Sequence, residues 1–262
     1  MARIRRPALS AEQKWLLELG SLHVSTLEPS YWGLLETNVK RWSKEVSVGN
    51  LWTEIEEVIP AWRTEYHAMT NSALLAELVL PEFVPKSAKS IKEKLLRNYL
   101  MNPDCLTASF TTSSPVLPLL NDLVRTRITC KYLDGVEFLA NKIADLANSL
   151  GCHTLHERQG KISGYFAQHI IVVQPVIYQI AGESVMAEIS CEIQIASEMG
   201  TKMWEVSHSL YETVRRNGTA DESWQWNPAD PRFISSQLGH MIHLVDGLLI
   251  QLRDASKVNN ER

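Results

Sequence analysis

The chain has 262 residues and a formal net charge of −4, and apolar residues make up 45% of it. These values are typical of a folded globular protein and exclude a long disordered chain. A protein that grips long nucleic acid without sequence preference is usually basic. The charge therefore disfavours broad RNA binding, although it leaves room for a local basic pocket that holds one nucleotide.

Cysteine usage and the chain end bear on the cellular compartment. No two cysteines have the CxxC spacing of a zinc or redox motif, and we expect reduced thiols at Cys105, Cys130, Cys152 and Cys191. The N-terminus is basic but lacks the apolar stretch of a signal peptide, and no run approaches the ~18 apolar residues of a membrane span. We therefore expect a cytoplasmic protein with no membrane partner. Export through a specialised secretion machine would leave no such mark, so that route stays open.

The first part of the chain, to about residue 80, predicts helices. Ser10 to Gln13 has the capping-box pattern and opens an amphipathic run that contains Trp15. Pro29 begins a second helix. A third helical stretch, from Leu51 to Leu80, is expected to break or kink at Pro60.

The remainder of the chain mixes strands with helices. Helical spacing of apolar residues predicts helices over Asp134–Gly151, Ser197–Arg216 and Pro231–Ala255. Strands are predicted over Leu123–Cys130, Tyr165–Val173 and Ala187–Ile195. Strands with helices between and around them indicate an α/β or α+β sheet, not a helical bundle.

A basic segment precedes the first of these strands. At about 100° per residue, a helix through this segment has an apolar side and a cationic side with Lys86, Ser90, Lys94 and Arg97. A helix N-terminus with ammonium groups beside it suits a polyphosphate. Taken alone, such a charge run is more often a solvated lysine face.

Two strands carry polar groups at alternating positions. Glu192 and Gln194 share one face of the strand 187–195, where a carboxylate can hold Mg²⁺ or accept a proton from an attacking hydroxyl. Tyr165 and His169 share a face of their strand, where an aromatic ring can stack on a base and an imidazole can bind phosphate. The alternatives are an exposed sheet face for the first pair and a satisfied core pair for the second.

Together these segments resemble the RelA/SpoT synthetase family, and the resemblance covers about residues 84 to 212. The family has a basic Lys-Ser…Ser…Lys segment, then Asp-x-x-Gly-x-Arg, Gly-Tyr-x-Ser-x-His, Glu-x-Gln-Ile-Arg-Thr and a Trp…Glu-His pair. The ordered matches here are Pro85-Lys86-Ser87 with Ser90 and Lys94, Asp122-Leu-Val-Arg-Thr-Arg127, Gly164-Tyr165…His169, Glu192-Ile193-Gln194-Ile195 and Trp204…His208-Ser-Leu-Tyr211.

The resemblance implies an α+β fold, with a mixed β-sheet flanked by helices and related to nucleotidyltransferases. It implies an N-terminal helical extension at 1–80, a synthetase domain at 81–216 and a C-terminal loop and helix at 217–262. The implied activity is transfer of the β,γ-diphosphate of ATP to the 3′-hydroxyl of GDP or GTP, with release of AMP.

The resemblance also implies roles for single residues. Asp122 and Glu192 would hold Mg²⁺ at the ATP phosphates, and Glu192, with Gln194, would help to deprotonate the acceptor hydroxyl. Tyr165 would stack on the acceptor base, and His169 would contact acceptor phosphate or ribose. The residues expected to bind ATP are Lys86, Ser90, Lys94, Arg97 and Arg127. Strict strand alternation would place Asp122 and Arg127 on opposite faces, unless Asp122 precedes the regular strand or a bulge intervenes.

Several positions depart from the family pattern, namely Val84, Arg125, Phe166, Ala167, Ala196-Ser197 and Ser207. These changes spare the expected metal ligands, the tyrosine and the two lysines, which indicates retained chemistry with an altered substrate. Candidate acceptors are guanine nucleotides, adenine nucleotides or the 3′ end of a tRNA, and the last two would suit a toxin with a neutralising partner. A non-catalytic nucleotide- or partner-binding module is the other reading, and a homo-oligomer stays open.

Overall fold

The computed structural model describes residues 10–22, 29–102, 120–180, 182–216 and 223–260. These residues form helices and one mixed five-stranded sheet with the strand order β1-β2-β5-β4-β3. The strands are β1 (Val84–Pro85), β2 (Val124–Cys130), β3 (Thr154–Gly160), β4 (Phe166–Ile180) and β5 (Glu183–Ser197). The helices are α1 (Ala11–Leu22), α2 (Pro29–Ser47), α3 (Asn50–Thr70), α4 (Ala88–Met101), α6 (Leu133–Ser149), α7 (Glu198–Arg216), η3 (Ser223–Trp226) and α8 (Pro231–Asn260). The predicted fold class is confirmed.

The chain packs into two units that interleave along the sequence. Unit 1 comprises residues 1–49, 83–125 and 173–192, and unit 2 comprises residues 50–82, 126–172 and 193–262. Strands β2, β4 and β5 each contribute residues to both units. The predicted domain boundaries at residues 80 and 216 divide the chain by function and not by packing. They therefore stay a prediction.

Unit 1 is built on α2, whose apolar stripe is buried. Asn38 donates through Nδ2 to the carbonyl of Gln179 at 2.9 Å and accepts through Oδ1 from the amide of Gln179 at 3.0 Å. Trp42 donates through Nε1 to the carbonyl of Ile177 at 2.8 Å. These bonds supply partners for backbone groups of β4, and an unpaired buried backbone group would be costly.

The predicted capping box at the start of α1 is confirmed. The Ser10 amide donates to Oε1 of Gln13 at 2.9 Å, and the Gln13 amide donates to Oγ of Ser10 at 3.2 Å. Each side chain thus satisfies a backbone donor that the first helical turn leaves without an internal partner.

The third predicted helix needs a correction. Helix α3 runs through Pro60 without a break and ends at Thr70, not at Leu80. Asn71 adopts a left-handed φ of 52°, a conformation that ends helices and that asparagine tolerates well. The following segment instead pairs with the end of β2, because Ala76 donates to the carbonyl of Thr129 at 2.9 Å. Backbone pairing with a strand has replaced the expected last turns of helix.

Strand β3 was not predicted from the sequence. It pairs antiparallel with β4, from Thr154 opposite Val172 to Gly160 opposite Phe166. Its sequence, Thr-Leu-His-Glu-Arg-Gln-Gly, has one large apolar residue and no buried face, so it lacks the alternation that marks a half-buried strand. It lies at the end of the strand order, where a polar edge strand discourages pairing with other chains.

The described cysteines are free thiols, as the sequence predicted. Burial raises the pKa of both Cys130 and Cys191, in the latter case to about 12. Both behave as small apolar core residues. Cys105 lies outside the described residues.

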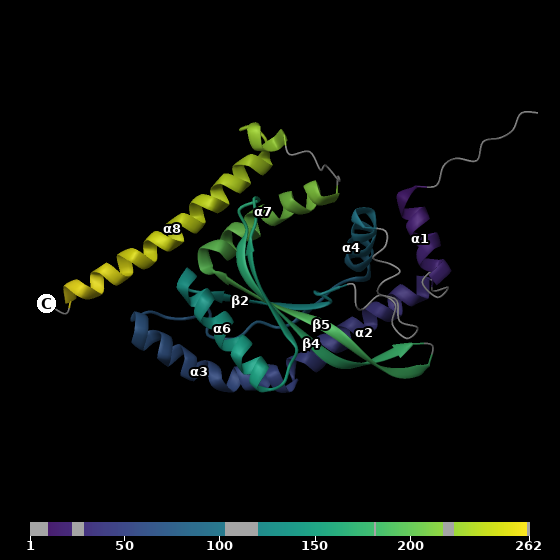
Figure 1. Ribbon diagram of the computed structural model, residues 1–262, viewed down its shortest axis with the longest axis horizontal. Helices are drawn as coiled ribbons and strands as arrows, with labels where there is room; N and C mark the ends of the chain where they lie inside the picture. Colours follow the sequence, from purple (N-terminus) through teal and green to yellow (C-terminus); the bar gives the residue numbers. More distant parts are fainter. Residues whose placement is uncertain (1–9, 23–28, 103–119, 181, 217–222, 261–262) are drawn as a thin grey trace, which may run out of the picture. The chain divides into compact units, whose positions relative to one another are not determined.

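Within unit 2, helix α8 packs along α7 (Figure 1). It crosses the β3–β4 turn at a pair of glycines: a Cβ on Gly239 would lie 2.4 Å from the carbonyl oxygen of Gly164. A Cβ on Gly164, whose φ is +79°, would lie 2.6 Å from the carbonyl oxygen of Ser236. Only glycine at both positions allows this approach of helix and turn.

The expectation that no run could span a membrane also needs a correction. Within the described residues one helical segment, Pro231–Ser256 of α8, is long and apolar enough to do so by length and composition. A single segment of this kind is weak evidence of a membrane span. The buried Asp246 lies within it, and a carboxylate inside a bilayer is costly.

Candidate active site

Two lysines and an aspartate form a cluster in unit 1, which we call the lysine cluster. Lys86 Nζ lies 2.6 Å from Oδ2 of Asp122, and Lys94 Nζ lies 2.7 Å from Oδ1. The Asp122 side chain is 14% exposed. Asp122 comes two residues before β2 begins and therefore lies outside the regular strand. This is the first of the two arrangements predicted above, in which Asp122 precedes the strand; the second was a bulge.

The start of α4 holds the lysine cluster in place. Ser87 is the N-cap, and its Oγ accepts from the amide of Ser90 at 3.3 Å. Lys86 is fixed next to this cap by its own amide, which donates to the carbonyl of Leu123 at 2.8 Å. Ser90 therefore serves the cap, while Arg97 is half-buried one turn beyond Lys94. The Ala88 amide at this helix N-terminus donates to Glu36 at 2.9 Å, so the two ammonium groups are the groups that suit an added anion.

The charges of the lysine cluster shift two pKa values. Burial alone would raise the pKa of Asp122, but the two ammonium groups outweigh it and hold that pKa at about 2. Burial lowers the pKa of Lys86 more than the attraction of Asp122 raises it. Asp122 is thus ionised at neutral pH. Two cations face one anion, which leaves a net positive charge for a phosphate.

Unit 2 contains a second set of the predicted residues. Arg127 donates to Oε1 of Gln194 through Nη2 at 2.8 Å and through Nε at 3.2 Å. Its guanidinium also lies 5.4 Å from the ring centroid of Trp204, within cation–π range. Arg127 is therefore oriented from two sides.

Tyr165 and His169 lie together, as their spacing predicted, but Tyr165 immediately precedes β4 and only His169 lies on the strand. The Tyr165 hydroxyl lies 2.9 Å from Nε2 of His169, which is buried. The Tyr165 ring also packs against Trp204, with ring centroids 4.8 Å apart. The tyrosine is half-buried, so its ring is held in position while it remains accessible.

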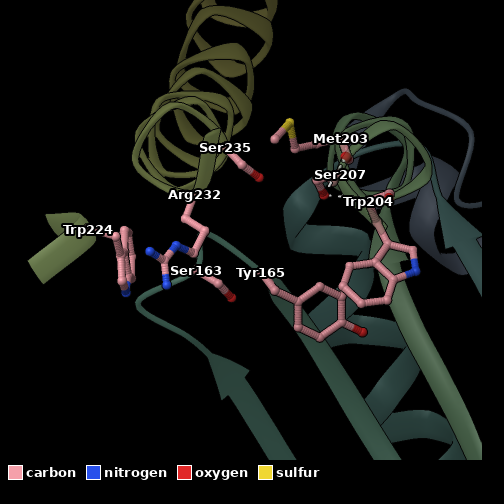
Figure 2. A pocket seen from close by; sticks show the side chains of 10 residues that line it. Ser163, Tyr165, Met203, Trp204, Ser207, Trp224, Arg232 and Ser235 are labelled. Carbon is pink, nitrogen blue, oxygen red and sulfur yellow. Dashed lines mark hydrogen bonds between the residues drawn. The ribbon is translucent and has the colours of Figure 1, made fainter. Parts of the chain in front are cut away.

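A cavity of about 170 Å³ opens beside Tyr165, and we call it the aromatic pocket. Figure 2 shows Tyr165 next to Trp204 and, across the cavity, Arg232 next to Trp224. The Arg232 guanidinium is held by Asp230 at 2.7 Å and lies 5.8 Å from the Trp224 ring centroid. Ser163, Ser207 and Ser235 add hydroxyls to the lining.

Sequence reasoning did not connect Trp224 or Arg232 with the site. Both come from the C-terminal segment, whose chemistry the motif pattern left unassigned. The signal that could have found them is the local sequence Asp230-Pro-Arg232 after two tryptophans, since arginine and tryptophan often form binding pockets together. The resemblance ended at about residue 212 and gave no reason to connect them with Tyr165.

Glu192 lies on β5 and is 9% exposed. It shares a strand face with Gln194, and every residue from Cys191 to Ser197 is buried. The alternative of an exposed sheet face is therefore wrong for these two residues. A buried glutamate needs a polar or charged partner, which suits a residue that handles protons or a cation.

The donor chemistry of Asp122 can be tested against Mg²⁺. Magnesium in phosphate-transfer sites is usually held by one or two carboxylates together with phosphate oxygens. Among the described residues, no three His, Cys, Asp or Glu side chains gather to hold a metal by themselves. An ionised Asp122 fits a metal that arrives with ATP, provided that a lysine moves from the carboxylate to the phosphates.

Some departures from the family pattern have a structural reason. Phe166 stacks on His243 of α8, with ring centroids 3.8 Å apart and planes 4° apart. Ser197 accepts from the amide of Gly200 at 3.0 Å at the start of α7. Ser207 donates to the carbonyl of Met203 at 2.9 Å. The side chain of His208 lies outside those that the structure describes.

Comparison with known sequences gives little coverage. No family model matches the chain. A nucleoside triphosphate pyrophosphatase of Cyanothece sp. is 35% identical over 83 residues, which are 32% of this chain and 40% of that protein. The chain thus spans less than half of this relative's length.

Comparison with solved structures shows the fold. Small alarmone synthetase 1 from Bacillus subtilis is similar with a TM-score of 0.54 at 16% identity, over 86% of this chain and 97% of that protein. The same synthetase bound to its product pppGpp gives a TM-score of 0.50 at 17% identity, over 83% and 99%. The chain therefore shares the α+β fold of these structures. In particular, it has the fold of the small alarmone synthetases.

Proposed function

We propose that this chain is an ATP-dependent pyrophosphokinase that transfers the β,γ-diphosphate of ATP to the 3′-hydroxyl of a guanine nucleotide. The observation that carries the proposal is the lysine cluster: two ammonium groups converge on one ionised carboxylate beside the N-terminus of α4. Phosphoryl-type transfer needs positioning and charge neutralisation more than covalent chemistry from the protein. The synthetase fold supports this assignment.

The lysine cluster would bind the ATP polyphosphate. Lys86 and Lys94 would neutralise phosphate oxygens, while the first turn of α4 is capped within the chain: the Ala88 amide donates to Glu36 and the Ser90 amide to Ser87. Arg127, which Gln194 orients, supplies a further charge for the transferred group. Mg²⁺, when bound by Asp122 and Glu192, would neutralise charge on the phosphate oxygens.

The aromatic pocket would bind the acceptor base. Tyr165 offers its ring for stacking, Trp204 supports it, and His169 holds its hydroxyl. The described residues that line the pocket include no carboxylate, and the charged group among them is Arg232. Arginine pairs well with the O6 and N7 acceptors of guanine, whereas adenine presents an amino donor at the corresponding position. The pocket therefore favours a guanine nucleotide over an adenine nucleotide.

The bond changes balance with one proton transfer. The 3′-oxygen of the acceptor attacks the β-phosphorus of ATP, and the bond from that phosphorus to the α,β-bridging oxygen breaks. The hydroxyl proton passes to Glu192, Gln194 helps to orient the hydroxyl, and AMP leaves with the bridging oxygen. A buried glutamate is suited to act as such a base.

The experiment must separate transfer from hydrolysis, because both release AMP from ATP. We would incubate the purified full chain with ATP, Mg²⁺ and, in turn, GDP, GTP, ADP, tRNA or no acceptor. We expect AMP and a guanosine 3′-diphosphate in equal amounts, with a guanine nucleotide as acceptor.

Other outcomes identify the competing functions. AMP with free pyrophosphate and no acceptor would indicate hydrolysis, the reaction named for the cyanobacterial relative. Product with tRNA or ADP alone would favour the toxin, whose neutralising partner would then be sought. No AMP under any condition would contradict catalysis and favour a nucleotide- or partner-binding module.

A further inference from the structure

One side chain of unit 2, Trp204, contacts two groups with different proposed tasks. Its ring packs against Tyr165, with ring centroids 4.8 Å apart and planes tilted by 52° (Figure 2). The Arg127 guanidinium lies 5.4 Å from the centroid of the same indole. Trp204 therefore joins the ring that would stack on the acceptor base to the cation that would neutralise the transferred diphosphate.

The position of Trp204 beside Arg127 follows from a register between α7 and the end of β2. Three side-chain pairs connect them, at steps of two residues along the strand and three along the helix. They are Lys131–Glu198, Thr129–Thr201 and Arg127–Trp204. The ion pair, at 2.5 Å, and the contact between the threonine hydroxyls, at 3.4 Å, hold the first turn of α7 against the strand. Alternate strand residues share a face, so this register brings the indole to the guanidinium.

Arg127 takes its orientation from the indole and from an amide. Gln194 accepts through Oε1 from Nη2 of Arg127 at 2.8 Å and from Nε at 3.2 Å, while the indole face attracts the cation. Arg127 also lines a cavity of about 220 Å³ together with Thr129 and Thr201, so a ligand can approach this side chain. A change in the direction of the guanidinium would therefore change what it offers to a ligand.

We propose that Trp204 is a positioning residue that couples the acceptor to the transferred group. A base stacked on Tyr165 confines the tyrosine ring, and the tyrosine ring confines the indole. The indole then keeps the Arg127 guanidinium in the direction of the diphosphate. Tryptophan attracts a cation more strongly than the smaller aromatic rings do, which suits it to this position. This inference rests on the proposed function, which supplies the acceptor and the transferred group.

The competing role for Trp204 is that of a simple wall of the aromatic pocket. A wall affects only how tightly the acceptor binds, so its loss would raise the KM for the acceptor and leave kcat unchanged. A positioning residue acts through Arg127 and changes kcat as well, because a displaced guanidinium stabilises the charge of the transition state less well. The effect on kcat therefore separates the two roles.

The first test is kinetic and compares Trp204→Leu with Trp204→Phe in the full chain. We expect Trp204→Leu to lower kcat about 10-fold and Trp204→Phe to stay within about 3-fold, because a ring that attracts the cation remains. In an Arg127→Met background, the leucine change should have no further effect on kcat. The control is Val206→Ala, at an exposed residue of the same helix, which should keep both kcat and KM. An unchanged kcat in Trp204→Leu, or an equal fall in the Arg127→Met background, would overturn the proposal.

A binding experiment tests the coupling without turnover. Calorimetry would measure the affinity of the full chain for GDP with and without an α,β-methylene analogue of ATP, whose bridge cannot break. We expect the analogue to raise the affinity for GDP about 5-fold or more in the unchanged chain and in Trp204→Phe, but not in Trp204→Leu. Independent binding of the two nucleotides to the unchanged chain, or equal coupling in Trp204→Leu, would overturn this inference and leave the proposed function standing. If neither nucleotide bound, the proposed function would fail, and this inference with it.

Discussion

The lysine cluster and the aromatic pocket recognise their ligands by opposite means. In the lysine cluster, two cations share one carboxylate that lies next to a helix N-terminus, so recognition depends on charge. The aromatic pocket is lined by two tryptophans and a tyrosine, and Asp230 neutralises its arginine. The first arrangement suits a polyphosphate of any nucleotide, and the second suits a planar base. Nucleotide selectivity should therefore reside in the aromatic pocket.

The largest expected effect is loss of turnover when the acidic residues are changed. We expect Glu192→Gln and Asp122→Asn each to lower kcat by roughly 1,000-fold or more, because one removes the proposed base and both remove a proposed metal ligand. The measurement is AMP release under saturating ATP and acceptor.

The matched control for Glu192 is Glu188→Gln, an exposed glutamate on the same strand, which should keep its activity. Circular dichroism should give the same spectrum for all three variants. A variant at position 192 or 122 with near-normal kcat would mean that the residue is misassigned.

The next effect separates the two regions by substrate. We expect Tyr165→Ala to raise the KM for the acceptor by about 10- to 100-fold, since stacking of a base on an aromatic ring is worth about 1–3 kcal/mol. Lys94→Met should instead raise the KM for ATP, because it removes one of the two phosphate-binding ammonium groups. Initial rates with each substrate varied in turn provide both values.

Two milder variants sharpen this separation. Tyr165→Phe keeps the ring and loses the hydroxyl that contacts His169, so it should stay within a few-fold of the unchanged chain. Lys89→Met changes an exposed lysine on the same helix and should leave both KM values unchanged. Equal changes in both KM values for Tyr165→Ala would remove the proposed division between the two regions.

The two regions were also unequally predictable from the sequence. Lys86, Lys94 and Asp122 could be connected because their order matched a known pattern, although no local rule places residues 86 and 122 together. Arg232 and Trp224 could not, because their positions follow from the packing of α8 against the β3–β4 turn. That packing depends on the close approach of Gly164 and Gly239, and a single glycine in a helix is not recognisable as a contact from the sequence.

A change at this glycine contact is expected to have a medium effect that spreads to the aromatic pocket. The methyl group of Gly239→Ala would meet the backbone of Gly164, which is rigid, so we expect about 2 kcal/mol of destabilisation. Because Arg232 and Ser235 precede this contact on α8, the KM for the acceptor should rise while the KM for ATP stays unchanged. Urea unfolding and initial rates provide the two measurements.

Gly247→Ala is the control, since nothing lies within 4 Å of a Cβ at that position. It should be neutral or slightly stabilising, because alanine favours the helix. If Gly239→Ala were equally neutral, the crossing of α8 and the turn would not be as tight as the structure describes.

The smallest expected effect is a pH dependence that belongs to the lysine cluster. The two neighbouring ammonium groups lower the pKa of Asp122 from its ordinary value of 3.8 to about 2 in the folded chain. Its ionised form therefore stabilises the fold fully above pH 4, and this contribution is lost as the pH falls through about 2. Linkage gives about 2.5 kcal/mol for the whole shift, of which about 1 kcal/mol is lost by pH 3. Beside the aromatic pocket, the hydrogen bond from Arg232 likewise lowers the pKa of Asp230, so that pair adds a dependence of the same sign.

Urea unfolding of the unchanged chain and of Asp122→Asn at pH 7, 4 and 3 checks this contribution. We expect the difference in unfolding free energy between the two proteins to be constant from pH 7 to pH 4 and to shrink below pH 4. Asp145→Asn, at an exposed aspartate of α6, should show no such change. A difference that is the same at pH 3 as at pH 7 would show that the lysines do not hold the Asp122 carboxylate ionised. The lysine cluster would then not recognise its ligand by charge in the way proposed.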